Sequence, residues 1–235
     1  MRLILLRLEG PLQSWGEHSK WDDRDTARFP TKSGIIGLIA CCAGYTRGDE
    51  RIDELHRSLH ISVRGDNMGK LDVDFHTVKS DRMMKADGTV KNHTIVSHRQ
   101  YLENASFLAA ISSEKEELLD RIAAVLQDPV WTPYLGRKSC VPTVPVFQCD
   151  TDMYRDAEDA FRQYPLSDLP EASFGYQNRK NRNARVPAEI EDTGGQFERT
   201  DQLVDADRRM FTVRRVRRVS YAREEIGDVS FSTQT

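Results

Sequence analysis

The sequence lacks a hydrophobic run long enough to cross a membrane. In a chain of 235 residues, the longest apolar stretches, such as residues 35–43, fall well short of the roughly 20 residues that a bilayer requires. Residues 1–6 are largely apolar, but Arg7 and Glu9 interrupt them before the apolar core or the cleavage site of a signal peptide is formed. We therefore expect a cytoplasmic protein that makes no contact with membranes.

Cysteine is also scarce, and its spacing excludes the common metal and disulfide frameworks. None of the four cysteines belongs to a CxxC pair, and two of them are adjacent in the chain. His56 and His60 lie one helical turn apart, but no third ligand follows at a recognisable spacing. The sequence predicts neither a metal nor another cofactor, and it predicts buried thiols at Cys41, Cys42, Cys140 and Cys149.

Hydrophobic residues make up only 38% of the chain, charged residues make up 30%, and the net charge is −3. The aromatic residues, at 8%, are nevertheless numerous enough to support a folded core and to exclude wholesale disorder. A chain of this length corresponds to one compact domain, or to one domain with an elaborate extension.

Hydrophobic periodicity places the predicted elements in the order strand, helix, strand, strand, helix, strand. Apolar residues that alternate with polar ones predict strands, and apolar residues at helical spacing after a capping residue predict helices. The expected elements are a strand at 2–9, a helix at 33–44, a short amphipathic helix ending near residue 59, strands at 60–65 and 99–111, a helix after the capping box at 113–116, and a strand at 144–148. This order indicates an α+β fold with a ferredoxin-like (RRM-like) βαββαβ core, which leaves one face or its loops free for a ligand.

Two segments do not fit this pattern. Residues 65–98 show no strong period, and a structureless loop of that length is usually functional. Residues 150–235 are highly charged and interrupted by prolines, which indicates irregular β structure wrapped on the core. We therefore expect one domain over 1–148, with a long insertion at about 66–98, and a carboxy-terminal extension over 149–235 packed on it.

Basic residues are clustered although the whole chain is slightly acidic. Four cations fall between residues 173 and 188 and seven arginines between 208 and 223, in both cases without an acid. Such runs are the electrostatic footprint of a phosphate backbone, although a solvated surface or an edge facing a protein partner has the same composition. The two runs contain Arg179, Lys180, Arg182 and Arg185, and Arg208, Arg209, Arg214, Arg215, Arg217, Arg218 and Arg223.

A second basic feature precedes the first predicted helix. Arg28, Thr31, Lys32 and Ser33 bring two cations and two hydroxyl groups to a helix N-terminus, where free backbone N–H groups favour an anion. The glycine pattern of a Walker A loop is missing, which disfavours an ATPase. Simple capping of the helix by Thr31 or Ser33 is the structural alternative.

Residues 132–139 form a third candidate, a basic loop centred on a glycine. Tyr134 is suited to stacking on a base, and Arg137 and Lys138 are suited to neutralising phosphates. An ordinary turn is the alternative. Three further aromatic residues are candidate base platforms, with burial in the core as their alternative role: Trp15, Trp21 and Tyr101.

Five short segments form an ordered and regularly spaced set within residues 1–148. They are Leu-Glu-Gly-Pro-Leu-Gln-Ser-Trp-Gly at 8–16, Arg-Phe-Pro-Thr-Lys-Ser-Gly-Ile-Ile-Gly-Leu at 28–38, Asp-Phe-His-Thr-Val at 74–78, Arg-Gln-Tyr-Leu at 99–102 and Tyr-Leu-Gly-Arg-Lys-Ser-Cys at 134–140. This set resembles the CasD family, subunits of the type I-E CRISPR Cascade complex that belong to the RAMP superfamily. The carboxy-terminal third of the chain matches that family only loosely.

The resemblance implies a ferredoxin-like core that binds RNA, in a subunit that holds the 5′ handle of the crRNA. It implies that the insertion at 66–98 is a thumb reaching over the guide toward the adjacent CasC backbone subunit. The CasA large subunit and target DNA are the further partners expected in the assembled complex. Arg99 is carried over from the family's Arg-x-Tyr-Leu motif. The expected RNA-binding residues are Arg28, Thr31, Lys32, Ser33, Arg99, Tyr101, Tyr134, Arg137, Lys138 and Ser139, and additional candidate contacts are Trp15, Arg179, Lys180, Arg182, Arg214, Arg215, Arg217 and Arg218.

A metal-independent endoribonuclease that processes precursor crRNA is the principal alternative function. Such cleavage needs a base, an acid and a cation at the phosphate, for which His18, Tyr134 and Lys20 are candidates. In the type I-E branch a separate CasE subunit cuts the RNA, so we expect no enzymatic activity here. A third hypothesis is an oligomeric ferredoxin-like protein that binds no nucleic acid.

Overall fold

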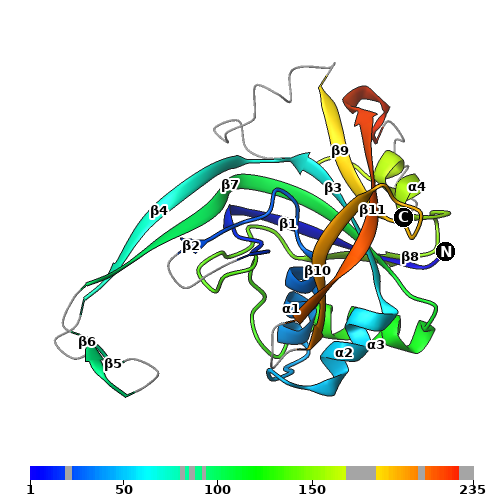
Figure 1. Cartoon of the computed structure of the whole chain (residues 1–235). Coiled ribbons are helices and arrows are strands. Elements are labelled where there is room, and N and C mark those ends of the chain that lie inside the picture. The colour runs from blue at the N-terminus through cyan, green and yellow to red at the C-terminus, as the bar shows by residue number, and fades with distance from the viewer. Residues whose placement is uncertain are drawn as a thin grey trace.

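The computed structural model describes residues 1–18, 23–79, 83–84, 88–91, 94–167, 184–205 and 210–227. In these residues four α-helices accompany one large, mainly antiparallel sheet (Figure 1). The sheet contains β1 (Leu3–Gln13), β2 (Asp23–Arg24), β3 (His60–Asn67), β4 (Lys70–Val78), β7 (Ile95–Ser112), β8 (Phe147–Thr151), β9 (Arg185–Glu191), β10 (Phe197–Asp205) and β11 (Met210–Ala222), and β5 (Met83–Met84) pairs separately with β6 (Val90–Lys91). The helices are α1 (Lys32–Cys42), α2 (Glu50–Ser58), α3 (Glu116–Gln127) and α4 (Ala157–Gln163), with a 3-10 turn, η1, at Arg223–Glu225.

The strands run in the order β10, β11, β9, β3, β7, β1, β8 across the sheet. Neighbouring strands of this path pair antiparallel, with β7 between β3 and β1 and with β8 on the far side of β1. The strands and helices predicted over the first 150 residues are therefore present, although several boundaries differ from the prediction.

Two apolar layers cover the two faces of the central strands. Ile4, Leu6 and Leu8 of β1 pack on the side that α1, α2 and α3 cover. Leu3 and Leu5, which alternate with them, pack on the side that α4 and the carboxy-terminal strands cover. Because side chains alternate across a strand, this pattern requires β1 to be buried on both faces.

The predicted structureless excursion after residue 65 is wrong. β4 pairs with the first half of β7 from Lys70↔Glu103 to Val78↔Ile95, and the two strands project from the body as a long arm (Figure 1). Leu71, Val73 and Phe75 alternate with polar residues in β4, but almost the whole strand is exposed. The alternation over residues 71–75 is itself a strand signal, and the prediction overlooked it within the polar segment.

The β structure predicted after residue 150 is present, but it is regular and not irregular as expected. β9 pairs with β3, and β11 and β10 continue the same sheet outward. α4 covers the sheet near β3, because the buried guanidinium of Arg64 donates hydrogen bonds to the carbonyl oxygens of Tyr164 (2.8 Å) and Pro165 (3.1 Å). The carboxy-terminal segment therefore belongs to the main sheet, and its charged composition reflects internal ion pairing.

Two local boundaries need correction. The capping box expected at 113–116 is not formed, since α3 begins after Lys115 and the Ser113 hydroxyl donates to the Ser58 carbonyl oxygen instead (2.8 Å). The strand expected at 144–148 begins three residues later, as β8, after a stretch that contains two prolines. Proline lacks the N–H that a paired strand needs, which delays the start of pairing.

Candidate nucleic-acid interface

The N-terminus of α1 is occupied by groups of the chain itself. Thr31 is the N-cap residue, and its hydroxyl accepts a hydrogen bond from the Gly34 N–H (3.2 Å). The backbone N–H of Lys32 donates to the carboxylate of Asp201 (2.9 Å), and its buried ammonium contacts Glu191 (2.8 Å). The anion site expected here is therefore already filled by a carboxylate, so Thr31 and Lys32 have a structural role in this fold.

Asp201 connects this helix start to the arginine run of β11. Arg214 binds the Asp201 carboxylate with two hydrogen bonds, of 2.6 and 3.0 Å, and both side chains are buried. Burial acts to raise the pKa of Asp201, but the hydrogen bonds and positive charge of Arg214 outweigh it and hold that pKa below its ordinary value. Arg214 was expected as a contact to a nucleic acid or a partner, and the structure instead places it inside an internal ion network.

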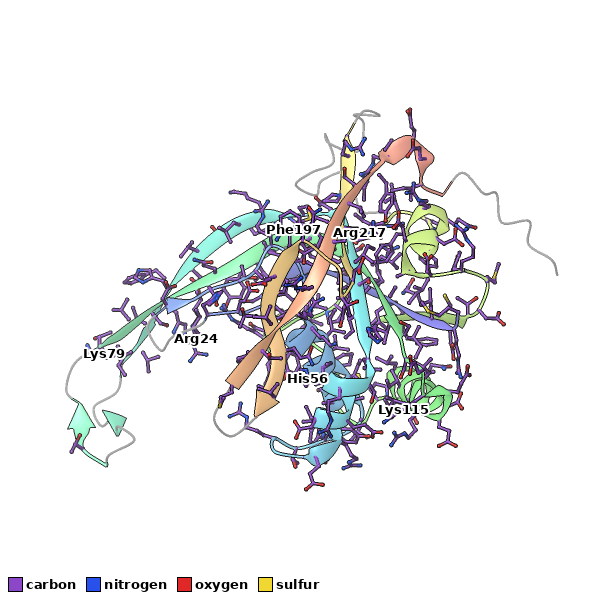
Figure 2. The ribbon with its side chains drawn as sticks, turned by 45° about the vertical axis from the view of Figure 1, so that its right-hand side comes forward. Arg24, His56, Lys79, Lys115, Phe197 and Arg217 are labelled. Carbon is purple, nitrogen blue, oxygen red and sulfur yellow. The ribbon has the colours of Figure 1, made fainter. Side chains whose placement is uncertain are left out.

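The exposed arginines of β11 also have acidic neighbours. Arg215 lies 3.9 Å from Glu198, and Arg218 donates to Glu189 at 3.0 Å. Arg217 contacts Glu158 at 2.7 Å. Figure 2 labels Arg217 and Phe197 at the same end of the β10–β11 hairpin. The positive charge that the sequence concentrates in this strand is thus largely neutralised by acids from other segments.

Trp15 was a candidate base platform, and it is a core residue instead. Its ring is 1% exposed, and its indole N–H donates to the Gln13 side-chain oxygen (3.0 Å). The structural alternative therefore holds for Trp15. Four further candidates lie outside the described residues: Trp21, Arg179, Lys180 and Arg182.

The basic loop predicted at 132–139 lies in an irregular segment, 133–141, that is hydrogen-bonded to the end of β1. The Ser14 N–H donates to the Leu135 carbonyl oxygen (3.1 Å), and the Leu135 N–H donates to that of Cys140 (2.8 Å). Gly136 has a φ of +86°, and a Cβ atom there would lie 1.7 Å from the Ser14 carbonyl oxygen. Only glycine permits this close approach together with a positive φ.

One side of this loop borders an open cleft of about 620 Å³ between α1, α2 and the β10–β11 hairpin. We call it the α1 cleft. It brings together three predicted site residues, Ser33, Tyr134 and Lys138, which come from two distant parts of the sequence. The other residues that matter for its chemistry are Gly37, Arg47, His56, Trp131, Leu203 and Phe211.

The other side of the loop borders the base of the arm. Arg137 lies over the ring of Tyr101, with its guanidinium carbon 4.5 Å from the ring centroid, and it donates to the Arg24 carbonyl oxygen (3.0 Å). Arg24 pairs in turn with Arg99 between β2 and β7. Figure 2 shows Arg24 beneath the arm. We call Arg24, Arg99, Tyr101 and Arg137 the arm-base cluster.

Several cations of this region lack an acidic partner. Among the residues that the structure describes, Arg28, Arg47 and Lys138 are exposed and form no ion pair. Arg137 has one buried nitrogen, Nη1, without a hydrogen-bond partner. A buried donor left unsatisfied in this way calls for a partner, and a phosphate oxygen or a water would supply it.

His56 is a feature that sequence reasoning did not assign to this site. It is 2% exposed, lies beneath the β10–β11 hairpin (Figure 2), and its Nδ1 atom has no hydrogen-bond partner. Burial, followed by the positive charge of Lys32, lowers its pKa to about 4, so the imidazole is neutral at pH 7.

Trp131 and Arg47 were also missed, although the sequence held a signal for both. Trp131 stands between two prolines in a segment without helical or strand period, and Arg47 directly precedes a glycine in a turn. Large or charged residues in such loops are seldom required by the core, and this is the position where binding residues concentrate.

The constellation expected for an endoribonuclease is not assembled in the described residues. His18 is exposed, lies 3.7 Å from Asp25, and does not line the cleft that Tyr134 lines. Lys20 lies outside the described residues. In the same described ranges no group of three or more His, Cys, Asp or Glu side chains is placed to hold a metal ion. None of the described helices has the length and hydrophobicity that crossing a bilayer demands.

The fold as a whole is similar to that of CRISPR-associated proteins. A model of the family described as CRISPR-associated protein (Cas_Cas5) matches residues 3–220. The chain therefore belongs to the Cas5 family. It is 36% identical over 155 residues to the CRISPR system Cascade subunit CasD of Escherichia coli (strain K12), a match that covers 61% of this chain and 69% of that protein.

Two solved structures resemble the whole fold. A chain of a CRISPR RNA-guided surveillance complex aligns with a TM-score of 0.73 and 31% identity, covering 93% of this chain and 89% of that one. A crystal structure of a Cas protein aligns with a TM-score of 0.72 and 30% identity, covering 96% and 97% of the two chains. The similarity thus extends through the carboxy-terminal strands, which the sequence motifs did not cover.

Proposed function

We propose that this chain is a non-catalytic crRNA-binding subunit of a Cascade-type surveillance complex and that it holds the 5′ handle of the crRNA in antiviral defence. The observation that carries the proposal is the gathering of cations around one loop, without acidic partners among the described residues, with Lys138 at the α1 cleft and Arg137 over Tyr101 at the arm. A single-stranded RNA needs cations for its phosphates and aromatic faces for its bases. The similarity to CasD supports the same assignment.

The proposed contacts divide by chemistry. Arg28, Arg99, Arg137 and Lys138 neutralise phosphates, and Tyr134 stacks on a base. Tyr101 is 8% exposed under the Arg137 guanidinium, so it positions that side chain. The hydroxyl groups of Ser33 and Ser139 are the remaining polar contacts. Trp15, Thr31, Lys32 and Arg214 are bonded inside the fold, and we leave them out of the interface.

The proposed architecture is a ferredoxin-like core over residues 1–148, built from β1, α1, β3, β7, α3 and β8. The strand order β3, β7, β1, β8 supports it, because a βαββαβ chain with two crossovers gives this arrangement. The β4–β7 arm is the thumb, which reaches the CasC backbone subunit. Residues 149–235 form the extension that meets the CasA large subunit, and target DNA is met only through the assembled complex.

A double substitution tests the RNA-binding proposal. Arg28→Ala with Lys138→Ala removes two unpaired cations, whereas Arg215→Ala with Arg218→Ala removes two exposed arginines that have acidic neighbours. Binding of handle RNA to the full chain is measured by filter retention over a range of salt concentrations. We expect the first variant to lower the slope of log affinity against log salt concentration by about 1.4, at roughly 0.7 per phosphate contact on a single strand.

The second double variant should leave that slope unchanged. An equal decrease of the salt slope in the two variants would show that paired and unpaired cations contribute equally to RNA binding. That result would contradict the proposed interface. RNA of the same length without the handle sequence separates general phosphate binding from recognition of the handle.

A further inference from the structure

Gly37 is an exposed glycine in the middle of α1 that internal packing does not explain. A Cβ atom added at Gly37 would meet nothing within 4 Å, whereas at Gly34, one turn earlier, it would lie 2.7 Å from the Trp15 ring. Glycine destabilises a helix interior relative to alanine. The absence of a side chain at Gly37 therefore leaves open space above the helix, in the floor of the α1 cleft, without relieving any contact inside the fold.

The walls of the cleft present flat apolar surfaces to this space. Trp131 is 48% exposed, and the hydrogen bond from the Val130 N–H to the Cys42 carbonyl oxygen (2.8 Å) fixes its loop to the end of α1. Leu203 and Phe211 of the β10–β11 hairpin line the cleft from another element. A planar ring that enters the cleft thus has an aromatic face and an aliphatic face available.

The polar groups of the cleft favour an anionic ligand. Arg47 and Lys138 form no ion pair with a described residue, and no aspartate or glutamate is among the lining residues. His56 lines the same cleft and keeps a buried, unpartnered Nδ1 atom. A ligand that combines a flat polar ring with a negative charge would contact the aromatic wall, the two cations and His56 together.

We propose that the α1 cleft binds one everted nucleotide of a single-stranded RNA, with the base over Gly37 against Trp131 and the phosphate between Arg47 and Lys138. The inference rests on the proposed RNA-binding function and assigns one nucleotide of that RNA to a defined pocket. His56 contacts the edge of the base as a neutral imidazole and thereby contributes to the choice of base. A volume of about 620 Å³ is within the range of small-ligand pockets.

Gly37→Leu tests this assignment, because its side chain extends into the cleft from a Cβ position that has no atom within 4 Å, and leucine favours the helix. Handle RNA carrying 2-aminopurine at each position in turn is titrated into the full-length protein, and the emission of 2-aminopurine reports stacking. We expect one position to be quenched in the parent and released in Gly37→Leu. Affinity should fall about tenfold or more, since one stacked base contributes on this scale.

Gly37→Ala is the matched control. It makes the same change of backbone propensity with a single methyl group, so it should bind within about threefold of the parent and unfold at an equal or higher temperature. Trp131 emission gives a second readout, obtained as the difference between the parent and Trp131→Phe during titration with AMP, GMP, CMP and UMP separately. Quenching by one or more of these nucleotides is expected.

The outcomes separate this inference from the proposed function. Tight handle binding by the parent with unchanged affinity and 2-aminopurine emission in Gly37→Leu would overturn the cleft assignment and leave the RNA-binding proposal standing. Absence of handle binding by the parent would overturn the proposed function, and the mononucleotide titration would still decide the cleft. If Gly37→Leu impairs only the association with a neighbouring protein subunit, the occupant is a polypeptide and the nucleotide assignment is wrong.

Discussion

Two basic regions of this molecule differ in what their charges face. In β11 four arginines lie within five residues of the sequence, yet Arg214, Arg217 and Arg218 contact Asp201, Glu158 and Glu189. Around the loop at 133–141 the cations come from separate segments, and Lys138 forms no ion pair with a described residue. The density of charge along the chain therefore does not report the density of charge available to a ligand.

The difference arises from sheet geometry. β9, β10 and β11 are adjacent strands, so acids of β9 and β10 lie across from the arginines of β11, and cross-strand neighbours of opposite charge attract one another. The loop at 133–141 is followed by β8 at the opposite edge of the sheet. Its Arg137 and Lys138 form no ion pair with a described residue. A basic strand is thus well suited to building a sheet, and a basic loop is well suited to binding a phosphate.

The largest expected effect is the loss of stability on removing the buried ion pair between Arg214 of β11 and Asp201. Arg214→Ala leaves the Asp201 carboxylate buried without its main partner, and removing one member of a buried pair costs about 3–5 kcal/mol. Urea unfolding followed by circular dichroism measures the change in the free energy of unfolding.

Arg215→Ala is the control on the same strand. Its side chain is 56% exposed and lies 3.9 Å from Glu198, so the loss should stay below about 0.5 kcal/mol. Equal destabilisation by the two substitutions would show that the internal ion network does not hold the hairpin to α1.

His56 lies between the two regions, and its buried imidazole should make the free energy of unfolding depend on pH in the acidic range. Burial and the charge of Lys32 lower its pKa to about 4 in the folded chain, against about 6.5 in an unfolded one. The unfolded state therefore takes up the proton first, and stability is lost as pH falls from about 6.5 to about 4. The loss is on the order of 3 kcal/mol.

His56→Gln removes this titration, so its free energy of unfolding should change less than that of the parent across the same pH interval. Urea unfolding at a series of pH values makes the comparison. Phe211→Leu alters another residue of the cleft without removing a titratable group, and it should keep the pH dependence of the parent. Parallel curves for His56→Gln and the parent would contradict the assignment.

Removing the acidic partners of a β11 arginine tests whether ion pairing keeps this strand from binding RNA. Glu158→Gln with Asp192→Asn removes the acids that contact Arg217, at 2.7 and 3.5 Å. If pairing is what keeps this strand from binding RNA, the variant should gain about one phosphate contact with RNA of arbitrary sequence, seen as a salt slope steeper by about 0.7. An unchanged slope would show that shape, and not charge pairing, excludes RNA from β11.

The smallest expected effect is none at all. His18→Ala alters an exposed histidine that the described structure does not join to Tyr134. Repeat RNA incubated with the parent or the variant in EDTA should remain intact, as analysed on a denaturing gel. A product ending in a 2′,3′-cyclic phosphate that disappears in His18→Ala would establish the endoribonuclease alternative.

Prediction from the sequence succeeded where a segment packs against a large apolar partner. The strand at the start of the chain and the helices around residues 33–44 and 118–126 were recognised because their apolar periods face the core. It missed β4, which lies in the segment expected to be structureless. It expected β structure after residue 150 but not the regular pairing of β9–β11 in the main sheet. In the site, Tyr134 and Lys138 could be chosen from their loop, but Trp131 and His56 could not be connected to them.

The sequence by itself determined the family motifs, the main periodic elements and the glycine-centred basic loop, because these depend on residues that are close in the chain. Only the tertiary structure decided which cations remain available. Lys32 meets Glu191 at a separation of 159 residues, and Arg214 meets Asp201 across a hairpin. Electrostatic interaction acts over a few ångströms in space, and the fold alone determines which charges come that close.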